Sequence, residues 1–492
     1  MKKMEVEVAV VAGGPAGLAA AITACENDRK TVLFEKSNTT GGAANMGMGV
    51  LGIDTSIQRS NFNDIDFQTA FRKHMEYTHY RVNGPLVSAY FRKSADTVEW
   101  LQDMGVVFAG SYRYSKDSEA TWHVVQPENG PIGPRAASGM IKIMTNRAIE
   151  LGCEILYETP AYDLIVEDGK VCGVLARDKD GEEIECRAKA VVVATGGFGS
   201  SAEMLKSELG LTLGVDQMTF MVPGVVGDGL KMMWKAGAQK YSMNMEVAGG
   251  VLAGNYSSTS MVFSQGDLLV NRDGIRFMAE SDSLNSTFFG NAVGDQPGRV
   301  AYSIIDGSIA RRYQKYGYPH ISIVHGTESH VNVMNDLKAA EEDKCPTIWH
   351  ADSVEELAEM IGIDPEVLAD TVDEYNDFCD QGYDEYFGKD RQDLRPLTGK
   401  GGYYACECRP GAYGTIGGVK VNAKMQVFDE DCRPFPVSTA PAQMPTRSTA
   451  TAITSSSPAT PWASPSTPAV LQAMASKIIW NLLTDRNTPF NG

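Results

Sequence analysis

Glycines close to the start of the chain have the spacing that lets a backbone approach a diphosphate. Gly13, Gly14 and Gly17 follow an apolar, valine-rich run that ends at Val11, and a run of small residues comes next. Small residues allow this close approach, and the N-terminus of the following helix would stabilise the negative charge. Glu35 lies roughly 20 residues further on, where a carboxylate can bind ribose hydroxyls. The pattern therefore predicts a dinucleotide-binding βαβ unit.

Position 12 departs from the usual G-x-G-x-x-G pattern, because Ala12 stands where the first glycine is expected. We expect Ala12 to make the turn with a negative φ, so that the motif is weakened but kept. The alternative of a glycine-rich turn that binds no nucleotide stays open. The predicted binding loop consists of Ala12, Gly13, Gly14, Pro15, Ala16 and Gly17.

Two further segments of small residues are expected to lie near the same ligand. Residues 40–44 follow Glu35 closely, and a second buried strand over residues 190–193 runs into another glycine turn. Two such strand–glycine units on either side of a meander are what a large flavin dinucleotide domain needs. The first would hold the pyrophosphate and the second would pass beneath the cofactor. The candidate residues of these segments are Gly41, Gly42, Ala43, Ala194, Thr195, Gly196 and Gly197.

Composition excludes several classes of function. The chain has 492 residues, which is too many for one simple core, and its net charge of −18 argues against binding nucleic acid or an anionic membrane surface. No apolar run approaches the roughly 20 residues of a membrane span, and the first residues lack the features of a secretory signal. Nine scattered cysteines form no C-x-x-C pair. We therefore expect no metal or iron–sulfur site, and a cytoplasmic location.

Helical and strand patterns connect the glycine motifs. Apolar spacing predicts two helices within residues 64–104, a helix over residues 136–151 and a meander over residues 155–188. Periodicity fails over residues 105–139, which predicts a long loop without regular structure that carries His123. An ordinary hydrogen-bonded histidine is the favoured interpretation of His123.

The amino-acid composition changes after residue 214, where glycine, serine, asparagine, methionine and aromatic residues become frequent. This change predicts an inserted domain, with a hairpin over residues 268–280. Two amphipathic helices follow, with Asp352 and Asp364 as their expected N-caps. The expected domains are residues 1–214, residues 215–345 and residues 346–492.

The motifs together resemble those of the flavoprotein family of fumarate reductase and succinate dehydrogenase, which includes urocanate reductases and 3-ketosteroid dehydrogenases. The matching segments stand in the family's order: the glycine motif with Glu35 and Lys36, Gly41-Gly42, residues 194–199, G-D-G at 227–229, residues 270–277 with Glu280, residues 382–389 and residues 414–418. The resemblance implies FAD as the cofactor, with Lys36 and Asp228 among its ligands. It also implies an α/β fold, in which a Rossmann-like FAD-binding domain is split by an inserted α+β capping domain.

The same resemblance implies an FAD-dependent oxidoreductase that acts on CH–CH or C=C bonds, with hydride transfer between flavin N5 and an activated alkene. Tyr413 and Tyr404 are the candidate proton-donating acids, and Arg276 and Glu280 complete the candidate catalytic set. The electron donor stays open between a nicotinamide, a free flavin and a partner protein. Two alternatives stay open as well: an FAD-dependent amine or hydroxyl oxidase, and a flavoprotein subunit or inactive relic that needs an electron-transfer partner.

Positions that bind the dicarboxylate in true fumarate reductases are not cationic in this chain. Ser260 and Phe263 stand where that family has a Glu and an Arg, Leu284 lies near its proton-donating Arg, and Tyr413 or Gly414 replaces its His. Two desolvated carboxylates need paired cations. We therefore expect a neutral or less charged activated alkene rather than fumarate. Aromatic and methionine side chains of the inserted domain suit such a substrate, although an ordinary core role for them stays open.

Residues 437–474 do not match the rest of the chain. Their proline, serine and threonine content is typical of a disordered linker, whereas the family has its last FAD-binding strand and helix there. Reading each codon from its third base forces alanine at Met444-Pro445 and glycine at Trp462-Ala463, and permits a glycine-rich ending of the family's kind. We hypothesise two compensating single-base shifts that bound this segment, with a natural linker as the alternative. As written, the segment is expected to be irregular and FAD retention weak.

Overall fold

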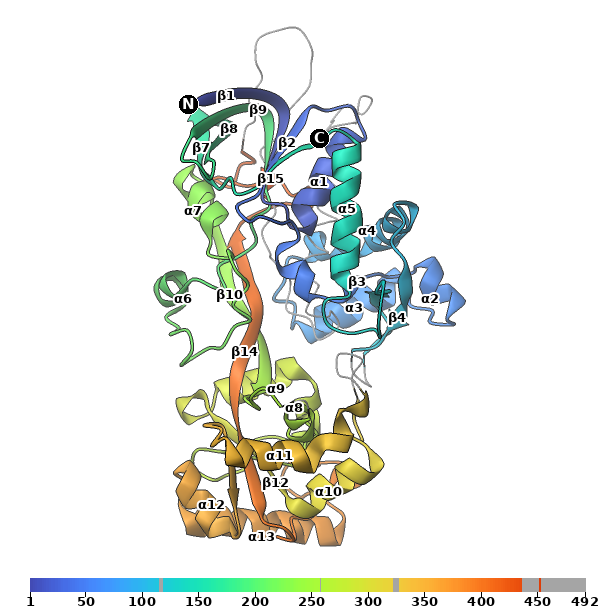
Figure 1. Ribbon diagram of the computed structural model, residues 1–492, viewed down its shortest axis with the longest axis vertical. Coiled ribbons are helices and arrows are strands. Elements are labelled where there is room, and N and C mark those ends of the chain that lie inside the picture. Colours follow the sequence, from blue (N-terminus) through green and yellow to red (C-terminus); the bar gives the residue numbers. More distant parts are fainter. Residues whose placement is uncertain (115–117, 257, 322–326, 436–450, 453–492) are drawn as a thin grey trace. The chain divides into compact units, whose positions relative to one another are not determined.

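The computed structural model describes residues 1–114, 118–256, 258–321, 327–435 and 451–452. Within this part the chain forms two compact units (Figure 1). The first unit holds residues 1–210, 220–246 and those from 414 onward, and the second unit holds residues 211–219 and 247–413. The mixed α/β composition predicted from the sequence is confirmed.

The first unit is built on a sheet that begins with the expected βαβ motif. Strand β1 (Lys2–Val11) leads into helix α1 (Pro15–Cys25) and strand β2 (Thr31–Phe34), and β1 pairs in parallel with both β2 and β9 (Glu183–Val193). The strand order is β6-β2-β1-β9-β8-β7. The expected meander is present as antiparallel β7, β8 and β9. The other strands of this sheet are β6 (Glu154–Leu156), β7 (Ala161–Glu167), β8 (Lys170–Arg177) and β15 (Thr451–Ala452).

Helices of the first unit lie where apolar periodicity predicts them. Asp66 and Asn83 cap two of them by accepting backbone hydrogen bonds, which fits their positions just before the apolar runs. The helices of this unit are α2 (Ser56–Ser60), α3 (Phe67–Tyr77), α4 (Gly84–Asp103), α5 (Ala137–Glu150), α6 (Ala202–Leu209) and α7 (Asp228–Lys235). None of the helices in the described ranges is both long enough and apolar enough to span a bilayer.

The expected structureless loop over residues 105–139 is wrong. Strands β4 (Phe108–Tyr112) and β5 (Trp122–Val125) lie within it and form a sheet with β3 (Gly49–Leu51). These strands are too short for periodicity to show them. His123 lies on β5 with no exposed surface, and its ring contacts the Thr55 hydroxyl at 2.7 Å and the Thr121 carbonyl at 3.1 Å. Burial lowers the pKa of His123 to about 4, as expected for a structural histidine.

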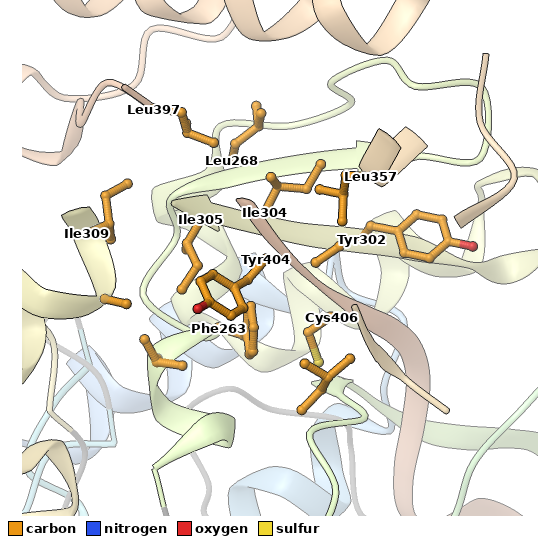
Figure 2. Close-up of a cluster of buried hydrophobic side chains, with 14 of the residues drawn as sticks. Phe263, Leu268, Tyr302, Ile304, Ile305, Ile309, Leu357, Leu397, Tyr404 and Cys406 are labelled. Carbon is orange, nitrogen blue, oxygen red and sulfur yellow. The ribbon is translucent and has the colours of Figure 1, made fainter. Parts of the chain in front are cut away.

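The second unit surrounds a sheet of order β10-β14-β12-β11, with β13 paired to β14. Figure 2 shows part of its apolar core, in which Phe263, Leu268, Ile304 and Tyr404 are buried together. The strands are β10 (Lys240–Val251), β11 (Leu268–Asn271), β12 (Ala301–Asp306), β13 (Ile348–Ala351) and β14 (Tyr403–Val419). The helices are α8 (Thr259–Val262), α9 (Ser286–Gly294), α10 (Gly307–Tyr316), α11 (Val333–Glu342), α12 (Val354–Ile361) and α13 (Pro365–Gln381).

The division into units differs from the domain boundaries expected from the sequence. Residues 346–413 lie in the second unit, because β13 and the first part of β14 pair with β12 or with each other. Residues 220–246 lie in the first unit instead of the insertion. Strands β10 and β14 each contribute residues to both units.

Two local expectations for the second unit also need correction. Of the hairpin over residues 268–280 only the turn around Asp273-Gly274 forms, closed by the Asn271 N–H to the Ile275 carbonyl at 3.0 Å. No second strand follows in this described part of the chain, which leads into a 3₁₀ turn (Glu280–Leu284). Helix α12 is capped by Ser353, not Asp352, because the Ser353 hydroxyl accepts the Glu356 N–H at 3.1 Å. The cap of α13 at Asp364 is confirmed.

Residues 437–450 and 453–474 of the anomalous segment lie outside the described residues. Between them, β15 pairs in parallel with β9.

Candidate cofactor-binding site

The glycine loop joins β1 to α1 in the geometry of a tight strand–helix turn. The Ala12 N–H donates to the Phe34 carbonyl at 2.8 Å, which anchors the loop beside the end of β2. A Cβ at Gly17 would lie 1.8 Å from the Ala12 carbonyl oxygen. Only glycine therefore allows the helix to pack this closely on the loop.

Glu35 lies directly after β2 and turns back to the loop. One carboxylate oxygen accepts the Gly13 N–H at 2.7 Å and the other accepts the Ser37 N–H at 2.8 Å. The side chain is buried. These two bonds hold the carboxylate beside the loop, where the sequence predicts that it binds a ribose.

Ala12 contradicts the expectation of a negative φ, because its φ is +80°. A left-handed alanine costs roughly 1 kcal/mol or more, since its Cβ crowds the backbone. The turn keeps this conformation although the residue is not glycine, so the loop stores strain at the position where the usual motif has its first glycine.

Replacing Ala12 with glycine is expected to relieve this strain and stabilise the first unit by about 1 kcal/mol. Urea unfolding followed by circular dichroism measures the change. Ala20→Gly is the matched control: Ala20 lies in the middle of α1, so glycine there should destabilise the unit by about 1 kcal/mol. Equal effects of the two substitutions would contradict the assignment of strain to Ala12.

Helix α1 begins without a side-chain cap. Gly14 is its N-cap and makes no side-chain hydrogen bond, and Pro15 opens the first turn. The first N–H groups of a helix lack partners within the helix and carry the positive end of its dipole. An α1 N-terminus next to a glycine loop therefore fits a pyrophosphate.

The two other small-residue segments lie against this loop. The Gly41 N–H donates to the Gly13 carbonyl at 2.8 Å, and the Ala194 N–H donates to the Val11 carbonyl at 2.8 Å. Gly41 has a φ of +108°, and a Cβ there would clash with the Asn45 side chain. Gly42 and Ala43 follow in a short 3₁₀ turn, and Thr195, Gly196 and Gly197 follow the end of β9.

An ion pair links Lys36 to the start of α7. Its Nζ lies 2.6 Å from an Asp228 carboxylate oxygen, and both side chains are partly exposed. The first unit thus brings together the glycine loop, Glu35 and the two other small-residue segments that the sequence predicted for the cofactor. An uncapped helix, close backbone approaches and a carboxylate beside the loop fit the dinucleotide part of FAD; the individual contacts stay predictions.

Arg276 and Glu280 lie in a buried network of the second unit. The Arg276 guanidinium binds Glu280 at 2.7 and 2.8 Å and Asp384 at 2.8 and 3.1 Å, which engages four of its N–H donors. Lys389 extends the network, with its Nζ 3.4 Å from Glu280 and 2.8 Å from the Tyr375 hydroxyl. These contacts favour a structural role for Arg276 and Glu280 over the expected catalytic one.

The two tyrosine candidates lie far apart on β14. Tyr404 is buried in the core shown in Figure 2 and stacks on His350 with ring centroids 4.3 Å apart. Tyr413 is nine residues further along the strand, which is about 30 Å at roughly 3.3 Å per residue. They cannot serve one reacting atom, and the core position of Tyr404 leaves Tyr413 as the candidate.

The structure adds Glu246, which the sequence did not single out. It lies on β10 and is 7% exposed, and in the described part of the chain no hydrogen bond or ion pair engages its carboxyl group. Burial raises the pKa of Glu246 to about 8. In the sequence it is one acid among methionines and aliphatic residues, and only burial distinguishes it from the many surface acids.

A family model described as "FAD binding domain" matches residues 7–436, and the match stops one residue before the anomalous segment. The vinyl phenol reductase of Lactiplantibacillus plantarum is 29% identical over 445 residues, which cover 87% of this chain and 87% of that protein. A fumarate reductase (cytochrome) of Shewanella frigidimarina is 28% identical over 436 residues, covering 86% and 69%.

The fold is shared with a solved structure of 3-ketosteroid-Δ4-(5α)-dehydrogenase from Rhodococcus jostii. The TM-score is 0.75 at 20% identity, with 98% of this chain and 97% of the other covered. With the family match over most of the chain, these findings confirm the expected fold class and FAD as the cofactor. The chain belongs to the FAD binding domain family and is an FAD-dependent oxidoreductase of the fumarate reductase type.

Proposed function

We propose that this protein reduces an activated alkene that is neutral or carries at most one charge. The observation that carries the proposal is the replacement of dicarboxylate-binding positions by Ser260, Phe263 and Leu284. Phe263 is 2% exposed in the core of the second unit, and its carbonyl accepts the Ser303 hydroxyl at 2.8 Å. Its apolar ring packs in the core there, so it cannot supply the positive charge of the arginine that fumarate reductases have at this position.

The remaining buried cations near these segments are already paired. Arg276 is held by the carboxylates of Glu280 and Asp384, and Lys389 by Glu280 and by the backbone carbonyl of Asp267. A second substrate carboxylate would thus enter a low-dielectric site without a partner, which costs several kcal/mol. A vinyl phenol, the substrate named for the Lactiplantibacillus relative, is a neutral alkene of the proposed class.

When bound and reduced, FAD would supply the hydride for the β-carbon of the alkene. The chain's own part is to hold the pyrophosphate at the α1 N-terminus, to place the ribose at Glu35 and to supply a proton to the α-carbon.

The structure describes all nine cysteines, and all are free thiols. Free thiols are usual in a reducing compartment, so we propose that the enzyme works in the cytoplasm.

A substrate panel tests the proposed function. Protein loaded with FAD is reduced with dithionite and mixed anaerobically with a vinyl phenol, an α,β-unsaturated ketone, acrylate or fumarate, and flavin reoxidation is followed by absorbance. We expect at least one neutral alkene to reoxidise the flavin on the order of 100-fold faster than fumarate, because an unpaired carboxylate raises the barrier by several kcal/mol.

The same panel separates the alternatives. Fast reoxidation by fumarate alone would contradict the proposal. Reoxidation by oxygen with peroxide release, and by none of the alkenes, would instead indicate an oxidase. Activity that appears only with a co-purified protein would indicate a flavoprotein subunit. The electron donor is found by offering NADH, NADPH and reduced free flavin to the oxidised protein.

A further inference from the structure

Glu246 is a buried acid that the proposed reaction has not yet used. Its side chain is nine-tenths buried, and no hydrogen bond or ion pair to it occurs in the described part of the chain. An unpaired carboxylate would be costly at such a site, so the carboxyl group keeps its proton. A buried carboxylic acid that stays neutral can act as a general acid, because it still holds a proton to donate, as in enzymes that hold general acids in apolar pockets.

The pairing of β10 with β14 shows which face of the sheet Glu246 shares. The Lys420 N–H donates to the Gln239 carbonyl at 3.0 Å, and Gly417 lies against the Ser242 carbonyl. This register brings Asn244 opposite Thr415. Because side chains alternate along a strand, Glu246 lies on the same face as Asn244.

Thr415 connects that face to the second glycine turn. Its hydroxyl accepts the Phe198 N–H at 3.1 Å, just after Gly196 and Gly197. Tyr413, two residues from Thr415 on β14, points to the same face by alternation. Glu246 therefore lies on the face of the β10–β14 pair that contacts the turn at Gly196-Gly197, which is predicted to pass beneath the cofactor.

We propose that Glu246 is the catalytic acid that protonates the α-carbon of the alkene. This inference rests on the proposed function. The O–H bond of the Glu246 carboxyl breaks as a C–H bond forms at the α-carbon, while the hydride supplied by reduced FAD makes the C–H bond at the β-carbon. The alkene gains two electrons and two hydrogens, FAD is left oxidised, and the Glu246 carboxylate regains its proton from water.

Burial alone sets the proton affinity of Glu246. Burial raises its pKa to about 8, and no charged group among the described residues contributes to the shift. The titratable side chains nearest to Glu246 along the two strands are Tyr241 and Lys240 on β10 and Tyr413, Arg409 and Cys408 on β14. An acid with a pKa near the working pH is mostly protonated at neutral pH and still gives up its proton readily.

Infrared titration tests the protonation state in the full chain as it exists, without a need for activity. Difference spectra between the unchanged protein and Glu246→Gln should show one carboxylic C=O band that persists at pH 6 to 7 and is lost as the pH passes about 8. A Glu246 that is already ionised at pH 6 would overturn the inference. Glu407→Gln is the matched control, because that carboxylate is paired with Arg409 at 2.6 Å.

The reductive half-reaction then tests the role in catalysis. With FAD-loaded protein, Glu246→Gln should slow flavin reoxidation by the best alkene 10²- to 10⁴-fold, the usual contribution of a general acid, while FAD binding stays unchanged. Glu246→Asp should recover part of the rate, and Glu407→Gln should keep it. The rate of the unchanged protein should fall above about pH 8, and this fall should be absent in Glu246→Gln.

The outcomes separate this inference from the proposed function. If the unchanged protein reacts with an alkene and Glu246→Gln reacts at the same rate, Glu246 is not the acid and the proposed function stands. If Tyr413→Phe alone loses the rate and the pH profile, Tyr413 is the donor and the inference is overturned. If the unchanged protein with FAD bound reacts with no alkene, the proposed function fails, and this inference fails with it.

Discussion

Restoring the reading frame across residues 437–474 is expected to turn a protein that retains FAD weakly into one that is yellow after purification. Six prolines in this segment each remove a backbone donor, and one inside a helix costs about 3 kcal/mol. They are Pro441, Pro445, Pro458, Pro461, Pro465 and Pro468. A helix across residues 455–468 is therefore not expected in the chain as written.

The family match supports the same expectation, because it ends at residue 436. The resemblance implies a strand, a glycine turn and a helix after that point, with the helix N-terminus towards the flavin. Such a terminus stabilises negative charge on the reduced ring. The glycine loop and Glu35 remain in the chain as written, so some affinity for the dinucleotide end is expected to persist.

The measurement is the FAD content of both proteins after the same purification, with equilibrium dialysis for the dissociation constants. A difference of about 100-fold or more is expected, which corresponds to roughly 2.7 kcal/mol. Tight binding by the chain as written would show that the segment does not matter. A stop codon in the shifted frame of the gene, or a translation without a glycine-rich ending, would refute the frameshift itself.

Breaking the buried ion network is expected to destabilise the second unit by about 3–5 kcal/mol, because it leaves a desolvated charge without a partner. Asp384→Ala is the direct test, since both Asp384 oxygens bind the Arg276 guanidinium and the carboxylate is fully buried. Urea unfolding followed by tryptophan fluorescence gives the change. Glu342→Gln is the control: its pair with Lys338 on α11 is exposed, so its loss should cost about 0.5 kcal/mol or less.

The pH dependence of this network has a definite sign. Burial raises the pKa of Asp384, but hydrogen bonds and the charge of Arg276 outweigh it, so that the pKa lies below its usual value. The stabilisation is therefore present above the pKa of the unfolded chain and is lost as the pH falls through the lowered pKa of the folded state. Asp384→Ala should remove this acid-dependent part of the unfolding free energy. Equal stability of the two proteins at neutral pH would contradict the role given to the network.

Short-range features of the chain were enough to predict segments that the first unit brings to the glycine loop. The glycine loop, Glu35 and the two other small-residue turns follow from rules that act within a few residues: strand composition, helix starts and close backbone approach. A parallel sheet then brings the carboxyl ends of its strands to one edge, so segments as distant as Val11 and Ala194 meet there. The N-caps of α3, α4 and α13 also depend only on residues within one helical turn. Asp66 and Asn83 lie within the range predicted for two helices, and Asp364 is the predicted cap itself.

Contacts between distant segments decided which candidate residues are buried and which are paired. The linear motif makes Arg276 a catalytic candidate, and only the fold shows that its partner Asp384, 108 residues away, makes it part of a buried network. Burial separated Tyr404 from Tyr413 and distinguished Glu246 from other acids. The left-handed conformation of Ala12 was not predicted from its residue type. Desolvation and ion pairing depend on which residues the fold brings together, and a one-dimensional pattern does not contain that information.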